Sequence, residues 1–280
     1  MWKYIKGGTE SCLRIAARQM KYVFLHADFW IVIAAMGAYY LTCLQGTSGY
    51  LEACGESLGV FAVFPAMMRE RDNLFLALAG YLFLVSDIPD FYPGVDMQVL
   101  RISRTVWYFS QWVYLLFLTA VYFLLLAVEQ TLLLIPFLEF TLGWGTAITN
   151  VGFTDDRFYY SADMSILQQG AVAEFLAFLA LIVLLALFLA GVCIACNMTF
   201  RYAGMGVLAG TLMIFAYLLY ETGGFSLGIW SPVETFARSE AAGTAGYAGY
   251  VCYYIFLCTL LFALGCHRLS KTDITERAVL

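Results

Sequence analysis

Five long runs without a charged residue constrain the fold of this chain more than any other feature of its sequence. A helix needs about 20 apolar residues to cross the roughly 30 Å hydrocarbon core of a bilayer. Each of the five runs reaches or approaches that length, so the sequence predicts an integral membrane protein that crosses the bilayer several times. The runs are Phe29–Leu51, Thr105–Val128, Phe175–Phe200, Tyr202–Tyr220 and Ala241–Cys266.

The small share of charged residues excludes a sizeable soluble domain. Only 12% of the 280 residues are charged, whereas soluble domains carry about 25%. We therefore expect an all-α polytopic membrane protein, with residues 1–280 forming a single transmembrane domain. Six spans are predicted, at about 28–46, 72–88, 107–134, 171–196, 203–220 and 247–266.

The region between the first two spans is harder to interpret, because two short apolar pieces flank a polar stretch there. We expect one passage, centred on Asn73–Ser86. The preceding piece, Ser57–Met68, is then an interfacial or re-entrant element bent at Pro65.

The positions of the basic residues predict the orientation, since Lys and Arg accumulate in cytoplasmic loops. A cytoplasmic N-terminus places eleven of the fifteen Lys and Arg residues inside. It leaves outside only Arg69, Arg71, Arg157 and Arg238. This orientation puts both termini of a multi-pass membrane protein in the cytoplasm.

A basic amphipathic helix is predicted before the first span, at about residues 9–26. Arg14, Arg18 and Lys21 share one side of it. The apolar residues of the other side are Leu13, Ala16, Ala17, Met20 and Phe24. Such a helix lies in the cytoplasmic interface, either as an orientation signal or as an elbow helix that contacts a cytoplasmic partner.

A second basic helix is predicted between spans two and three. Pro89, Pro93 and Gly94 end the second span with a turn. The following short helix, Met97–Tyr108, carries Arg101 and Arg104 on one face. Leu100 and Trp107 share another face with Ser103. The charged face is available to a soluble protein, although the two arginines also fit a role in topology alone.

Two carboxylates and two glycine-rich segments mark the predicted outer side. Glu129 lies near the outer end of span three, and Glu174 opens span four. Ionisable groups in a span usually face a water-filled cavity or a partner, so both are candidates for an outer vestibule or gate. The alternative is that they are carboxylates at interface level. Irregular backbone is expected at 136–153 and at 220–236, where glycine interrupts apolar sequence.

Motifs that carry chemistry are missing from the sequence. It contains no Walker-type nucleotide motif, no H-E-x-x-H and no G-x-S-x-G. Its eight cysteines are scattered, and the C-x-x-C at Cys193 and Cys196 lies in an apolar run. We expect no enzyme activity of the chain by itself, no metal or cofactor bound directly, and no nucleic-acid partner.

One stretch of the sequence resembles a known protein family. The sequence "SDIPDFYPGVDMQVLRISRTVWYFSQ" contains an aspartate–proline turn followed by R-x-x-R-x-x-W. Together with the six predicted spans and the N-terminal helix, it resembles the membrane (permease) subunits of ABC-2 type transporters, in a divergent bacterial branch. The local sequence similarity covers about residues 84–125, and the E-x-G-T pattern of better-known members is absent.

The resemblance implies an exporter whose ATP and Mg²⁺ are bound by separate ABC ATPase subunits, with a second permease copy or a paralogue as partner. The segment Asp96–Trp107 then corresponds to a cytoplasmic coupling helix. The implied ATPase contacts are Asp96, Met97, Leu100, Arg101, Arg104 and Trp107, together with Arg14 and Arg18 of the N-terminal helix. The implied cargo is a peptide or a lipid-like antimicrobial molecule.

The same resemblance places an outer gate near Gly223–Pro232, before the last span. The candidates for the pathway or gate are Glu129, Glu174, Glu221, Gly223, Gly224, Trp230 and Pro232. Two other functions stay open. One is a secondary transporter or channel that uses Glu129 or Glu174, although the chain has no internal repeat of the kind many such proteins show. The other is a non-transport integral membrane assembly protein.

Overall fold

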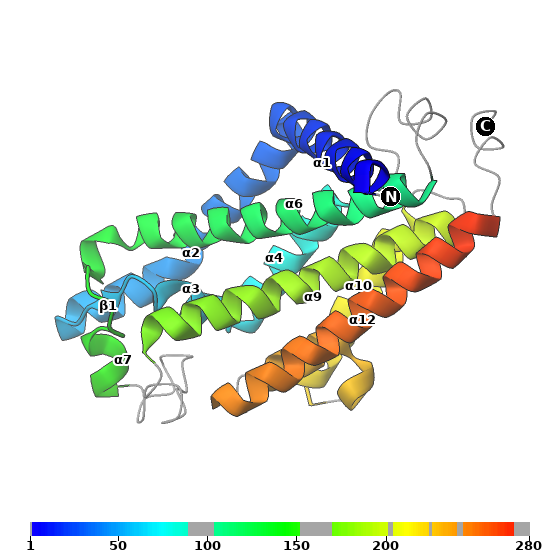
Figure 1. Cartoon of the computed structure of the whole chain (residues 1–280). Helices are drawn as coiled ribbons and strands as arrows, with labels where there is room; N and C mark the ends of the chain where they lie inside the picture. The colour runs from blue at the N-terminus through cyan, green and yellow to red at the C-terminus, as the bar shows by residue number, and fades with distance from the viewer. Residues whose placement is uncertain are drawn as a thin grey trace.

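The computed structural model describes residues 2–88, 104–151, 170–200, 204–223, 226–239 and 243–271, and these are mostly helical (Figure 1). The long and medium helices are α1 (Trp2–Leu25), α2 (Ala27–Cys54), α4 (Arg71–Leu84), α6 (Arg104–Leu133), α9 (Ala171–Phe200), α10 (Met205–Glu221) and α12 (Gly243–Lys271). The shorter elements are β1 (Leu58–Gly59), α3 (Val63–Met68), η1 (Ile135–Phe137), β2 (Leu138–Glu139), α7 (Thr146–Val151), η2 (Gly228–Trp230) and α11 (Pro232–Ser239).

Four helices are long and apolar enough to cross a membrane: α2, α6, α9 and the Tyr247–Arg268 part of α12. The chain is therefore an all-α membrane protein, as its uncharged runs predict. The predicted spans at 72–88 and 203–220 correspond to α4 and α10, which have 14 and 17 residues. At 1.5 Å per residue these two helices are only about 21 and 26 Å long. Both are shorter than the hydrocarbon core.

Helix α9 forms the centre of the bundle, and α12 lies at its edge. In their most apolar windows, 72% of α9 is buried but only 11% of α12. α9 packs against α6, α10 and α12. Gly206 of α10 lies so close to the backbone of Cys193 that a Cβ atom there would overlap it. The exposed side of α12 is available to lipid.

The bundle has two distinct ends, which we name by what lies there. Helices α2, α6 and α10 run away from α1, and α4, α9 and α12 run back toward it (Figure 1). We call the end at α1 the elbow end, which is the predicted cytoplasmic side. The opposite end, with β1, β2 and α7, is the distal end.

The first predicted span is longer than expected. Helix α2 continues eight residues beyond the predicted end at Gly46 and stops at Cys54. Gly55 then adopts φ 67°, and the Glu56 N–H donates to the Leu51 carbonyl. A glycine in the left-handed region is a common way to end a helix. Gly46 and Gly49 lie inside the helix and do not interrupt it.

The ambiguous segment Ser57–Met68 is enclosed by protein. Strand β1 pairs in parallel with β2, and all six side chains of α3 are buried. Pro65 occupies the first turn of α3, where its missing N–H has no helical partner to lose. It therefore belongs to a helix start and does not bend a longer element. Gly59 lies against the Gly143 carbonyl, where a side chain would not fit.

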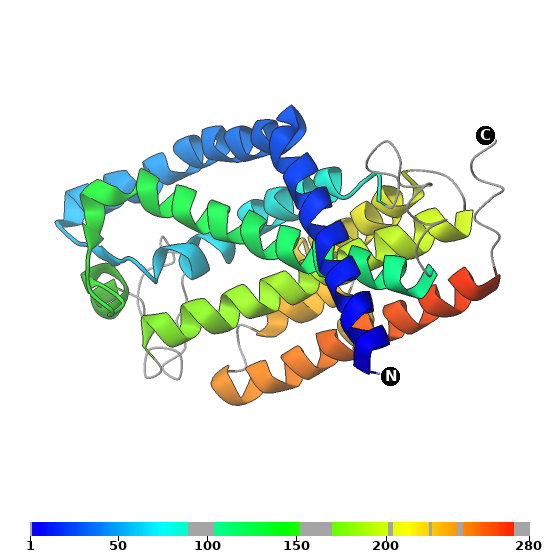
Figure 2. The ribbon, with the colours of Figure 1, turned by 45° about the horizontal axis from the view of Figure 1, so that its top comes forward.

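Helix α1 lies across α6 at the elbow end (Figure 2), and the predicted apolar face was partly wrong. Leu13 and Ala17 are exposed. The side chains that α1 buries are Cys12, Ile15, Ala16, Gln19 and Val23. The Gln19 amide donates to Oε1 of Gln111 in α6 at 3.0 Å. Since a hydrogen-bonded glutamine occupies the centre of the buried face, hydrophobic periodicity alone did not find that face.

Candidate functional sites at the two ends of the bundle

The predicted ATPase-contact surface is described only in part. Asp96, Met97, Leu100 and Arg101 lie outside the described residues. Arg104 is the first residue of α6, and its side chain is exposed. Arg14 and Arg18 are exposed on α1, which crosses α6 (Figure 2). The described arginines of the two predicted basic segments, Arg14, Arg18 and Arg104, therefore lie on two helices that cross at the same end of the bundle.

Trp107 does not belong to an exposed contact surface. Its side chain is only 5% exposed, because the first turns of α6 pack into the bundle. The neighbouring rings of Tyr108 and Trp112 both contact the ring of Phe262 in α12. Trp107 is thus a packing residue of α6.

The start of α6 is tied to the end of α12. Tyr108 stacks on Phe262 with ring centroids 5.4 Å apart and an interplanar angle of 29°. The Tyr108 phenol also lies against Gly265, where a Cβ atom would overlap it. Only glycine permits this approach, so the first turns of α6 pack directly on the last turns of α12.

Asn197 joins three further elements at the elbow end. Its Nδ2 donates to the carbonyls of Ser86 and Ile88 at 3.0 and 2.7 Å. Its Oδ1 accepts the Gly206 N–H at 2.8 Å. The side chain thereby links the residues after α4 to α9 and to the first turn of α10. Ile88 and Arg104, which flank residues 89–103, are both fixed to the bundle.

A buried ion pair lies toward the distal end. Arg69, in the turn between α3 and α4, donates from Nη2 to Oε1 of Glu174 at 2.5 Å. The Tyr247 hydroxyl of α12 donates to the same oxygen at 2.5 Å. The two charged side chains are 4% and 0% exposed. The Arg69 guanidinium also lies 5.8 Å from the ring centre of Phe178.

This arrangement changes the interpretation of Glu174. A carboxylate that lines an aqueous pathway would be accessible to water, whereas this one is enclosed and paired. Glu174 Oε1 accepts from both Arg69 and Tyr247, whereas Oε2 has no hydrogen-bond partner among the described residues. Glu174 therefore fastens three elements together: the α3–α4 turn, α9 and α12.

Glu129 has a different environment. It is half-buried, and its Oε1 lies against Gly37 of α2, where a Cβ atom would overlap it. Among the described residues, Oε2 has no hydrogen-bond partner. The neighbouring Gln130 is fully buried. No described ion pair or hydrogen bond joins Glu129 to Glu174, so the two carboxylates do not form one site.

The segment before the last span is organised around Glu234. This fully buried carboxylate accepts the Leu227 N–H at 3.0 Å and the Ser226 hydroxyl at 2.6 Å. Both of its oxygens also accept the Gly228 N–H at 3.2 Å. Glu234 therefore closes the loop that joins α10 to α11.

The loop and α11 fold back along α12. The Tyr253 hydroxyl donates to the Ile229 carbonyl and the Tyr254 hydroxyl to the Pro232 carbonyl, each at 2.7 Å. Tyr254 lies about 16 Å along α12 from Gly243, at 1.5 Å per residue. The contacts of η2 and α11 therefore reach α12 within its apolar part Tyr247–Arg268, near the first third of that part.

The predicted gate residues take different positions in this segment. Pro232 is buried, whereas Trp230 is 84% exposed. Gly223 follows the end of α10 with φ 77°. Glu221 is the last residue of α10, and its side chain lies outside the described set, as does Gly224. No described contact joins this segment to Glu129.

Sequence reasoning missed Arg69, Tyr247, Asn197 and Glu234 as organising residues. One signal was present for Glu234: Ser231 and Glu234 form the S-x-x-E spacing of a capping box. The Glu234 N–H does approach Ser231 Oγ, at 3.4 Å. Its carboxylate reaches beyond the cap to the loop. The other three residues meet partners more than 70 positions away or in separate elements, which no local pattern encodes.

Within the described part of the chain, no three His, Cys, Asp or Glu side chains gather as metal ligands. Comparisons of the chain with protein-family models, with curated proteins and with solved structures gave no match. The fold defines the class, a helical protein with several membrane-spanning helices. A more particular function rests on the geometry of the two ends.

Proposed function

We propose that this chain is the membrane-spanning permease subunit of an ATP-driven ABC exporter in a bacterial plasma membrane. It works with separate cytoplasmic ATPase subunits and with a second permease copy or a paralogue. The observation that carries the proposal is the position of α1. This helix lies across the elbow end of α6 and is held there by Gln19 and Gln111, while Arg14 and Arg18 stay exposed.

The topology of the proposal has six spans and both termini in the cytoplasm. Helices α4 and α10 complete the set that α2, α6, α9 and α12 begin. These two helices are short but can still complete a crossing, because the protein segments that flank them cover the part of the hydrocarbon core that they do not reach. Helix α3 precedes α4 as a buried element, and η2 with α11 follow α10.

The proposed mechanism uses α12 as the connection between the two ends. Closure of the ATPase dimer on ATP pushes on the segment Asp96–Arg104 and thereby on the start of α6. The contacts of Tyr108 with Phe262 and Gly265 pass the movement to α12. Further along α12, Tyr253 and Tyr254 hold η2 and α11, so this element moves as the outer gate.

The chemistry of the exposed surface supports an amphipathic cargo, such as a peptide or a lipid-like antimicrobial molecule. Ile229 and Trp230 of η2 are 71% and 84% exposed. They lie beside the apolar part of α12, at a depth where lipid or cargo is their natural surrounding. A gate with an apolar outer surface suits a molecule that leaves along the bilayer.

The test is the recovery of an ATPase with the affinity-tagged chain from native membranes. We expect a bound protein with a Walker-type sequence, and ATP hydrolysis that the chain stimulates. The double variant Arg101→Glu with Arg104→Glu should release it. Arg71→Glu is the matched control, because Arg71 is exposed near the distal end and binds the neighbouring Asp72. Unchanged binding and stimulation in the double variant would overturn the coupling assignment.

Glu129 favours a second candidate, a secondary transporter or channel. It is a half-buried carboxylate in a spanning helix, with one oxygen that makes no described hydrogen bond. Purified protein in liposomes, without ATPase, distinguishes the two functions. Flux driven by a proton or sodium gradient that Glu129→Gln abolishes would favour the secondary transporter. Export that needs ATP and the ATPase favours the permease.

A further inference from the structure

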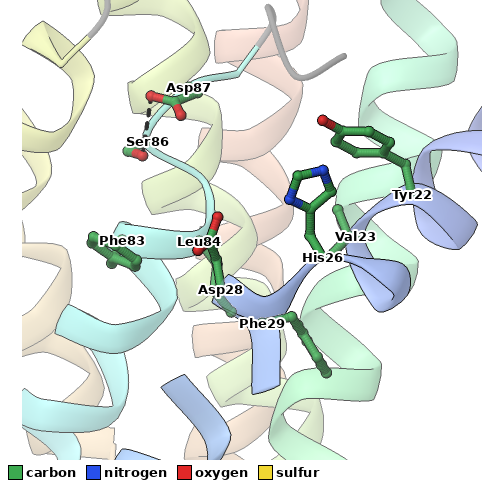
Figure 3. Close-up of a pocket in the computed structure, with 9 residues that line it drawn as sticks. All are labelled: Tyr22, Val23, His26, Asp28, Phe29, Phe83, Leu84, Ser86 and Asp87. Atoms are coloured by element: carbon green, nitrogen blue, oxygen red, sulfur yellow. Dashed lines mark hydrogen bonds between the residues drawn. The ribbon is translucent and has the colours of Figure 1, made fainter. Parts of the chain in front are cut away.

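A cleft of about 250 Å³ opens at the elbow end, where the α1–α2 junction meets the last turn of α4 (Figure 3). The described residues that line it divide into two kinds. The polar residues are Tyr22, His26, Asp28, Ser86 and Asp87. The apolar residues include Phe29 and Phe83, whose rings lie on different sides of Asp28 in Figure 3. Asp28, Phe83 and Asp87 are exposed, so the cleft is reached from the surface.

The polar residues of the cleft carry negative charge. The described lining contains two carboxylates and no lysine or arginine. Asp28 makes no ion pair or hydrogen bond within the described chain, and Asp87 accepts only the Ser86 hydroxyl there, at 3.3 Å. Figure 3 shows the two carboxylates on one side of His26, with Tyr22 on the other. This charge favours a cationic ligand.

Helix stability explains the position of one of the two carboxylates but not of the other. Asp28 lies in the first turn of α2, where the helix dipole favours a negative group. Asp87 follows the last turn of α4, where the dipole disfavours a negative group. The carbonyl end of α4 and Asp87 therefore present negative potential to the same space. A cation bound there compensates this negative potential. Folding alone does not require a carboxylate at this position.

The apolar residues of the cleft favour an amphipathic ligand. Phe83 is 60% exposed beside the carboxylates, and Phe29 is buried at the start of α2. A volume of about 250 Å³ lies below the roughly 300–1,000 Å³ of drug-sized pockets. It suits a small head group and the first part of an acyl or alkyl chain.

We propose that this cleft binds the ammonium group of an amphipathic primary amine, with Asp28 and Asp87 as its acceptors and Phe29 and Phe83 along its chain. A primary ammonium has three N–H donors for the carboxylates and the Ser86 hydroxyl. A quaternary ammonium has none. The ethanolamine head of a phospholipid and a single-chain alkylamine share this chemistry. Binding requires no ATPase, so the proposal stands or fails separately from export.

Native mass spectrometry of the purified chain, released from a neutral detergent, tests the class of ligand. The probes are dihexanoylphosphatidylethanolamine, dihexanoylphosphatidylcholine and dodecylamine. We expect adducts with the primary amines and at least tenfold less with the phosphatidylcholine. Retention of only the phosphatidylethanolamine identifies a lipid head group as the source, and retention of only dodecylamine identifies a single-chain amine. Equal retention of phosphatidylcholine would overturn the proposal.

Variants locate the binding. Asp28→Asn with Asp87→Asn should reduce the adduct at least tenfold. Glu52→Gln with Asp72→Asn is the control, because it removes two exposed carboxylates away from the cleft and changes the net charge equally. Ser86→Trp fills the cleft, keeps both carboxylates and should also abolish the adduct. Size-exclusion profiles verify folding. Undiminished adducts in folded Ser86→Trp, or equal losses in the control, contradict this location.

Discussion

At the scale of single residues, the distal part of the molecule depends on a charge that has been removed from water. Glu174 is fully buried and receives donors from Arg69 and Tyr247, which belong to two other elements. The loss of one partner leaves the other charge buried and uncompensated. The loss of both leaves space and no charge. The effects of the single and the double substitutions on the stability of the protein should therefore differ in sign and size.

We predict that Glu174→Leu or Arg69→Leu alone destabilises the protein by about 3–5 kcal/mol, because each leaves a buried charge without its partner. The double variant Arg69→Leu with Glu174→Leu should be more stable than either single variant. Thermal unfolding in detergent measures the difference. Arg71→Leu is the control, since its pair with Asp72 is exposed and should be worth less than about 1 kcal/mol. Additive losses in the double variant would contradict the pairing.

Glu70 predicts a dependence of stability on pH. Burial raises the pKa of this carboxyl, and the nearby Asp72 raises it further, against a hydrogen bond from Asn73 and the charge of Arg71. A raised pKa means that the folded state favours the protonated acid. Its contribution to stability is complete below the ordinary pKa of about 4.3 and is lost as pH rises through the raised value.

Replacing Glu70 with glutamine removes this titration. We expect Glu70→Gln to match the parent protein at about pH 4 and to exceed its melting temperature increasingly as the pH rises toward neutrality. Melting curves over that range, with Glu52→Gln as an exposed carboxylate control, make the measurement. A constant difference at all pH values would mean that Glu70 titrates normally.

At the scale of elements, sequence periodicity and length were enough for some helices and not for others. α9 begins at Ala171, as predicted, α12 contains its predicted span, and α6 ends one residue before the predicted end of its own. Each of these helices contains a long uncharged run, so the bilayer constraint alone predicts that it exists. The buried face of α1 needed knowledge of α6, because Gln19 is buried only through its bond to Gln111.

The elements at the distal end could not be predicted from the sequence, for a related reason. α3 is six residues long and is buried by neighbours that come from distant parts of the chain. The pair of Arg69 and Glu174 joins residues 105 positions apart. The sequence marked Arg69 only as an outside basic residue and Glu174 only as a candidate for the pathway. Charge and hydropathy give the level of a residue in the membrane, but not its partner.

The loop before α11 gives a prediction at this scale. Glu234→Ala leaves the N–H groups of Leu227 and Gly228 without an acceptor, at a cost of about 1–3 kcal/mol. We expect faster hydrogen exchange at residues 226–230, while α9 stays protected. Glu234→Gln keeps an acceptor oxygen and should be intermediate. Thr222→Ala, an exposed position next to the loop, is the control. Unaltered exchange in Glu234→Ala would show that Tyr253 and Tyr254 hold the loop alone.

At the scale of the whole molecule, α12 has side-chain contacts both to the start of α6 and to the segment of η2 and α11. Gly265 meets Tyr108 near one end, and Tyr254 binds Pro232 further along. α12 also packs along α9, where Tyr247 binds Glu174 and Leu261 lies against Gly191. A helix that contacts both the start of α6 and the segment of η2 and α11 is suited to transmit a displacement from one end of a bundle to the other.

Gly265 tests whether α12 has this role. Gly265→Leu places a side chain where the Tyr108 phenol lies, and such overpacking typically costs about 1–3 kcal/mol. We expect a lower melting temperature and, in the exporter proposed above, weaker stimulation of the ATPase although the ATPase still binds. Gly265→Leu with Tyr108→Ala provides space for the new side chain but removes the Tyr108 ring, so it should recover the melting temperature and not the stimulation. Gly249→Leu is the control, because no atom lies within 4 Å of a Cβ there. Recovered stimulation in the double variant would contradict this role, because it would show that the contact of Tyr108 with α12 does not carry the signal.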